Sequence, residues 1–270
     1  MILSLSLMLG LANAAPTAPS SADIPSLHTL LKPDSALARS ESSPIEKQAW
    51  FDQDALGIVG PKFQRYSFHF DSTWRSPTGD SALFQARSKS EGQICHIEGS
   101  ASLSNLESLP NGSKKSKEQL FRVTMSLKGR VSGCAKGGEV LGTLTAFAAK
   151  LPDGRKTIAM SRGLDWMNPY PANVKNRLYG NQFEGIWIGS AGDTTVGLKW
   201  GMDKIPASDR LDCGNTYFMP CGKNPDPAWK TWLTKHRCFS GDLDPEVCDA
   251  AFLQEDWWKP VASNAPDTAE

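Results

Sequence analysis

The sequence predicts a mainly β protein: an antiparallel β-sandwich or barrel of seven to eight strands, with a short disulfide-braced helical C-terminal segment (α+β overall). Three observations lead to this fold class. Apolar and polar residues alternate in several segments between residues 60 and 200, turn sequences rich in Pro, Asn, Asp and Gly separate those segments, and the last third changes to helical spacing. Short strands punctuated in this way are typical of sandwiches and closed barrels.

The alternation is clearest at residues 66–70 and 121–127, where every second residue is apolar. Successive strand residues project from opposite faces, so both segments are expected to be half-buried antiparallel strands. Further strands are predicted at residues 81–87, 93–98, 139–149, 156–160, 183–189 and 194–200, with turns at residues 110–112, 152–154 and 191–193. Alternation is common to sandwiches and barrels, so both remain open.

The beginning of the chain predicts secretion. A short apolar run ends in Ala12-Asn13-Ala14, the small-residue pattern that precedes a signal-peptide cleavage point. The stretch that follows is rich in Ala, Pro and Ser and is expected to be of low order. Inside it, Ile24, Leu27, Leu30 and Leu31 share one helical face, so this piece is expected either to dock on the body or to belong to a removable pro-segment.

The last third predicts two short helices, at about residues 227–237 and 245–257. Each begins at an Asp-Pro pair, Asp226-Pro227 and Asp244-Pro245, which suits the start of a helix. The expected organisation is therefore a signal peptide at 1–14, a low-order leader or pro-segment at 15–48, a β-rich domain at 49–202, a Cys-containing helical segment at 203–259 packed on it, and a disordered tail at 260–270.

The six cysteines support an oxidising compartment. They form an even set without the paired spacing of a zinc module, so three disulfides are expected. Proximity in the chain suggests Cys95–Cys134, Cys213–Cys221 and Cys238–Cys248, although six cysteines allow 15 connectivities. Asn111-Gly112-Ser113 is a sequon for N-glycosylation.

Charge and composition exclude several functions. The chain has 29 basic and 29 acidic residues, which argues against nucleic-acid binding driven by bulk charge. No apolar stretch approaches the length of a membrane span. The sequence holds no nucleophile elbow, phosphate-binding loop or dinucleotide motif, so no cofactor and no metal are expected, and a non-enzymatic role is favoured.

Two groups of residues are candidates for a functional site. His69 and Asp71 on one predicted strand and His96 and Glu98 on a later one could bind a metal or supply an acid and a base. Their alternation with apolar residues also fits an exposed polar face, which is the favoured interpretation. The second group is aromatic. Residues 161–182 lack strand or helix periodicity and contain Trp166 and Tyr170, which could stack on a sugar or anchor in a protein pocket, as could Trp258.

The layout of the chain resembles that of secreted, disulfide-containing effector-type proteins of plant-associated fungi. The resemblance rests on the signal sequence, the Pro- and Ser-rich leader, the six cysteines and the missing catalytic motifs. It implies an extracellular glycoprotein with a role in virulence that binds a host protein or glycan. The alternatives are a secreted hydrolase or carbohydrate-binding module and a structural wall protein. The sequence leaves the oligomeric state open.

Overall fold

The computed structural model describes residues 19–31, 55–78, 81–109, 118–135, 137–158, 181–192, 194–201 and 205–208, together with residues 220, 227, 229–230, 233–234 and 244–248. Its elements are a short 3₁₀ helix η1 (Ser21–Asp23), α1 (Leu27–Leu31), β1 (Ala55–Val59), β2 (Gln64–Arg75), β3 (Ser81–Ser90), β4 (Gln93–Leu109), β5 (Gln119–Ser132), β6 (Gly138–Lys150), β7 (Lys156–Ile158), β8 (Gln182–Gly189) and β9 (Thr195–Gly201).

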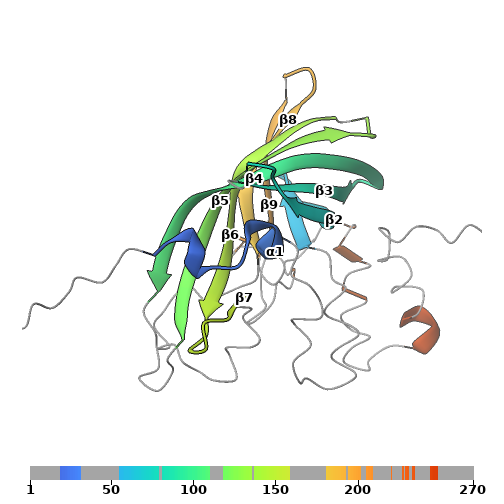
Figure 1. Ribbon diagram of the computed structural model, residues 1–270. Coiled ribbons are helices and arrows are strands. Elements are labelled where there is room, and N and C mark those ends of the chain that lie inside the picture. Colours follow the sequence, from blue (N-terminus) through green and yellow to red (C-terminus); the bar gives the residue numbers. More distant parts are fainter. Residues whose placement is uncertain are drawn as a thin grey trace, which may run out of the picture.

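The nine strands form one sheet that closes on itself (Figure 1). The order β5-β4-β3-β2-β1-β9-β8-β6 is completed by a pairing between β5 and β6. The short strand β7 pairs with residues 148–150 of β6, beyond the residues that pair with β8. Every pairing is antiparallel. The mainly β prediction is confirmed, and of its two alternatives the closed barrel forms rather than a pair of packed sheets. Closure pairs the edge strands, which removes the exposed edges of an open sheet.

The strand β1 was not among the predicted strands. Four of its five residues are buried, so both of its faces are covered. Its outer face lies under Ile205 and Trp229, which form a small buried cluster with Ile58. A strand that is covered on both faces has a continuous run of apolar residues in place of the apolar–polar alternation on which the prediction depends.

Aromatic side chains fill the middle of the barrel. The rings of Phe68 and Trp200 stack with their centroids 4.6 Å apart. The ring of Phe183 also stacks on that of Trp200, with the centroids 5.3 Å apart. Phe70 meets Phe68, Phe84 and Trp200 edge to face. The rings come from β2, β3, β8 and β9, so this cluster joins strands from both halves of the chain. Such ring pairs stabilise the folded protein by more than the burial of their apolar area alone would do.

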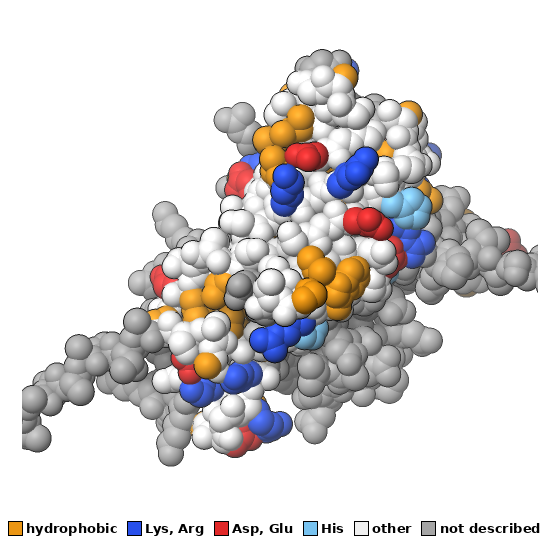
Figure 2. All heavy atoms as spheres, turned by 45° about the horizontal axis from the view of Figure 1, so that its top comes forward, with side chains coloured by type: hydrophobic (Ala, Val, Ile, Leu, Met, Phe, Trp, Pro, Cys, Tyr) orange, Lys and Arg blue, Asp and Glu red, His pale blue; other side chains and the backbone are white. Residues whose placement is uncertain are grey.

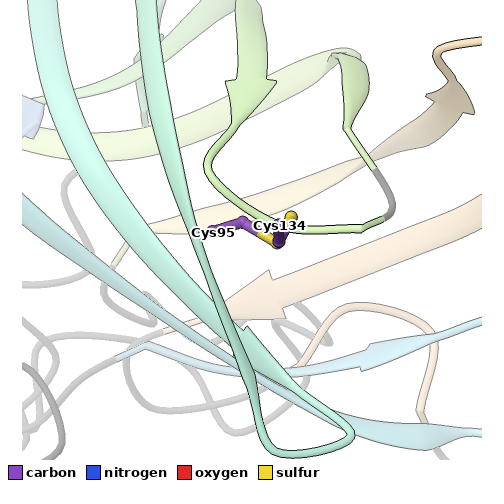
Figure 3. Close-up of a disulfide and its surroundings, with 2 residues drawn as sticks. All are labelled: Cys95 and Cys134. Atoms are coloured by element: carbon purple, nitrogen blue, oxygen red, sulfur yellow. A yellow bond between two sulfur atoms is a disulfide. The ribbon is translucent and has the colours of Figure 1, made fainter.

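A disulfide joins Cys95, near the start of β4, to Cys134 in the turn between β5 and β6 (Figure 3). This pairing confirms the prediction from proximity in the chain. Cys248 is also disulfide-bonded. Cys213, Cys221 and Cys238 lie outside the described residues.

The helical C-terminal segment is not supported. Within residues 203–259, the described backbone is helical only at residues 229–230, 233–234 and 245–248. Asp244 does begin a helical turn, because its carboxylate accepts the backbone N–H of Glu246 at 2.9 Å. A capping residue starts a turn but does not set the length of a helix, which depends on packing further along the chain. The predicted tail at 260–270 lies outside the described residues.

The first described segment, residues 19–31, docks on the barrel, and we call it the α1 segment. Ile24, Leu30 and Leu31 are at most 3% exposed and belong to the main core cluster, and Leu27 packs against it. The shared helical face therefore identified the buried side of this segment. The structure thus shows this piece of the chain docked on the body.

Candidate functional site

The His and carboxylate residues lie on two strands, β2 and β4, that are not neighbours in the sheet. Strand β3 separates β2 from β4, and the register places Arg87 opposite both His69 and His96. Two strand spacings put the backbones of His69 and His96 about 10 Å apart. The two imidazoles therefore do not meet, because β3 pairs with both strands and separates them.

Asp71 is held by Arg87 instead of by a histidine. A β-bulge between Phe70 and Ser72 displaces Asp71, and the guanidinium of Arg87 donates to both of its carboxylate oxygens, with Nε at 2.9 and 3.0 Å. The Nε2 atom of His69 lies 3.9 Å from Asp71, which is too far for a hydrogen bond. Sequence reasoning missed Arg87, whose position opposite His69 and next to the bulge appears only in the strand register.

Glu98 lies two residues after His96 on β4, opposite Gln85 of β3. It accepts a hydrogen bond from Gln85 Nε2 at 3.2 Å and stands opposite Arg130 of β5. On the face shown in Figure 2, acidic, basic and histidine side chains lie interspersed, and the hydrophobic side chains form small separate groups. Among the described residues, no group of three or more His, Cys, Asp or Glu could hold a metal ion.

The aromatic candidates Trp166, Tyr170 and Trp258 and the sequon residue Asn111 lie outside the described residues. The strands that flank Trp166 and Tyr170, and those that flank Asn111, are placed, however. Residues 159–181 join β7 to β8, and residues 110–118 join β4 to β5.

The connection from β4 to β5 joins antiparallel neighbours and therefore begins and ends at one end of the barrel. Strands β7 and β8 run in the same direction along β6, where Ile158 pairs with Ala148 and Gln182 with Thr145, so their connection begins and ends beside the last part of β6. That part of β6 leads to the end of the barrel where α1 lies, since Lys150 and Asn181 both contact residues 19–31. We call this the α1 end.

The two ends of the barrel differ in their connections. At the α1 end, residues 32–54 lead into β1, residues 110–118 and 159–181 join strands, and the chain leaves β9 at Gly201. The opposite end carries only short turns, at residues 60–63, 91–92, 133–137 and 190–194. Binding residues are found disproportionately on long connections held by a rigid scaffold. The α1 end is therefore the candidate functional site.

Three side chains of the barrel hold the α1 segment by polar contacts. Lys150 Nζ donates to Asp23 Oδ1 at 2.6 Å, and Thr73 Oγ1 donates to the carbonyl of His28 at 3.0 Å. The buried amide of Asn181 donates to the carbonyls of the last two residues of α1, at 2.6 and 3.2 Å. The contacts from Thr73 and Asn181 satisfy carbonyls that a helix leaves unpaired at its C-terminus.

The charge on Asp23 follows from this arrangement. The hydrogen bond from Lys150 and a second one from the backbone N–H of Ser20 lower the pKa of Asp23 to about 2. The carboxylate of Asp23 is therefore ionised above about pH 2, and in this form it pairs with the ammonium group of Lys150. Sequence reasoning missed Lys150, Thr73 and Asn181, because none belongs to a motif and each is brought to α1 only by the closure of the barrel.

Comparisons of this chain with family models, curated proteins and solved structures find no match. Among the described residues, no helix has the length and hydrophobicity that a membrane-spanning helix requires. The candidate site therefore depends on the geometry of the α1 end.

Proposed function

We propose that this protein is a secreted, extracellular binding protein that engages a host protein or glycan through the α1 end of its barrel. The observation that carries this proposal is the asymmetry of the two ends, because the connection that contains Trp166 and Tyr170 is anchored at the α1 end by β7 and β8. A disulfide-braced barrel filled by aromatic rings is a rigid scaffold for such connections.

The proposal favours binding over hydrolysis. A hydrolytic site needs an acid and a base that approach the same bond of the substrate. His96 and Glu98 face outward on β4, Asp71 is occupied by Arg87, and β3 stands between the two histidines. We call His69, Asp71, His96 and Glu98 the outer-face cluster. This cluster does not bring an acid and a base to one point, as the competing hydrolase hypothesis requires.

The test compares binding of the oxidised protein and its variants to host extracellular proteins and to immobilised cell-wall polysaccharides. Trp166→Ala and Tyr170→Ala are expected to weaken binding about tenfold or more, the effect of losing an aromatic anchor. Ile94→Ala is the matched control, since Ile94 is an exposed apolar residue at the opposite end of the barrel. His96→Ala and Glu98→Ala are expected to leave binding unchanged.

Two outcomes contradict the proposal. Equal binding by the aromatic variants and the Ile94 control would mean that the α1 end does not bind the partner through these rings. Cleavage of a polysaccharide that is lost in His96→Ala or Glu98→Ala would identify a hydrolase, and the outer-face cluster would then be its site.

A further inference from the structure

We propose that the α1 end is an acceptor site for a short amphipathic helical peptide, and that residues 19–31 are its resident and exchangeable occupant. The expected partner carries a carboxylate next to an isoleucine, and a pair of leucines at the end of a helical turn. This proposal concerns the same end of the barrel as the proposed function but does not use Trp166 or Tyr170, so either proposal can fail alone.

The first argument is that the sheet is complete without the segment. The pairings β1–β9 and β5–β6 close the ring, and none of the strand pairings involves residues 19–31. The segment lies against β2, β3, β4 and β6 through its side chains and its terminal carbonyls. Its departure would therefore leave no strand edge unpaired, unlike the loss of any strand of the ring.

The second argument is the size of the residues that line the barrel near α1. The strands that α1 touches contribute small buried residues to the core cluster. These small residues are Ala82 on β3, Ala101 on β4, and Ala146 and Ala148 on β6. Small side chains leave space, and Ile24, Leu30 and Leu31 of the segment belong to the same buried cluster. The alanines thus make room for apolar side chains that come from outside the sheet.

The third argument is the direction of the polar contacts. In each of them the barrel side chain donates and the segment accepts, and two of the three donors bind backbone carbonyls rather than side chains. Any peptide in the same backbone conformation offers the same carbonyls. Specificity then comes from the carboxylate that pairs with Lys150 and from the apolar residues that fill the space beside the alanines.

The segment also carries its own local structure. Ser20 and Asp23 form a capping box, and the hydroxyls of Ser26 and Thr29 are hydrogen-bonded at 2.8 Å. So few residues do not hold a helix alone in water, so a peptide of this kind orders as it binds. A tethered copy competes with a free peptide at an effective concentration on the order of 1 mM.

The experiment uses the full chain and a fluorescent peptide of residues 19–31. In the double variant Leu30→Asp/Leu31→Asp, the resident segment is disabled and Lys150, Thr73 and Asn181 are intact. We expect this variant to bind the peptide saturably, and the wild-type chain to bind it at least about 100-fold more weakly because of the tethered competitor. Adding Asn181→Ala to the double variant is expected to weaken binding about tenfold. A peptide with the same two Leu→Asp changes is the control and should not bind.

A second measurement on the wild-type chain guards against a variant that does not fold. If the segment is exchangeable, amide hydrogen exchange of residues 27–31 is expected at least about tenfold faster than that of the central residues of β4 and β5. Exchange at the same rate as those strands would overturn the proposal, as would a folded double variant that does not bind the peptide. Binding of a fluorescent fatty acid without binding of the peptide would also overturn it, because the site would then take a lipid chain.

Discussion

Gly142 and Gly185 lie opposite each other on β6 and β8, and the ring of Phe183 takes up the space that their side chains would need. A β-carbon at Gly185 would stand 2.6 Å from Cζ of Phe183, and one at Gly142 would stand 2.5 Å from the same atom. Neither distance is tolerated between carbon atoms. The aromatic stack in the middle of the barrel therefore depends on two glycines that face each other.

We predict that Gly185→Ala lowers the free energy of unfolding by about 1–3 kcal/mol, the usual cost of overpacking a core. Gly197→Ala is the matched control, since a β-carbon at Gly197 on β9 would have no neighbour within 4 Å. That change is expected to be neutral or slightly stabilising, because alanine is less costly to order than glycine. Urea unfolding of both variants measures the difference, and equal stability would show that Phe183 moves aside without cost.

Docking of the α1 segment is predicted to weaken in acid. The lowered pKa of Asp23 means that its ionised form is favoured in the folded protein. The stabilisation is fully present above the unfolded pKa of about 4 and is lost as the pH falls toward 2. The difference in stability between wild type and Asp23→Asn should therefore shrink between pH 5 and pH 2.

The matched control for this prediction is Asp153→Asn in the turn between β6 and β7. The pKa of Asp153 is also lowered, by hydrogen bonds from the backbone and side chain of Arg155, but the pair does not involve residues 19–31. Hydrogen exchange of α1 should respond to the change at Asp23 and not to the change at Asp153. An equal response to both would show that acid acts on the barrel in general.

Tyr66 is predicted to stay protonated in the folded protein at alkaline pH. Its side chain is fully buried, and this burial raises the pKa of its hydroxyl. The unfolded chain ionises first, so Tyr66 contributes stability below pH 10 that is lost at up to about 1.4 kcal/mol per pH unit above it. Tyr66→Phe should remove this part of the slope. Identical slopes between pH 10 and 11.5 would contradict the prediction.

Removing the Cys95–Cys134 disulfide is predicted to cost about 4 kcal/mol, because the bond closes a loop between residues 39 positions apart. The double variant Cys95→Ala/Cys134→Ala leaves the other cysteines in place, which treatment with a reductant would not. Urea unfolding under oxidising conditions measures the loss. A loss below about 1 kcal/mol would mean that the strand pairing of β4 and β5 already constrains this loop in the unfolded ensemble.

The sequence by itself determined the local features of this protein. Alternation located most of the strands, because residues on the inner and outer faces meet different solvents. The spacing from Ile24 to Leu31 identified the buried face of the α1 segment, and proximity in the chain identified the Cys95–Cys134 pair. Each of these features depends either on residues that are close in the chain or on whether a side chain faces the apolar interior or water.

The tertiary structure decided everything that depends on which strands are neighbours. It paired β5 with β6 and β1 with β9, placed β3 between the two histidines, and covered both faces of β1. It also brought Lys150 within 2.6 Å of Asp23, a residue 127 positions away in the chain. Such pairings are selected by the packing of the whole core, because the hydrogen bonds of one antiparallel pair resemble those of any other.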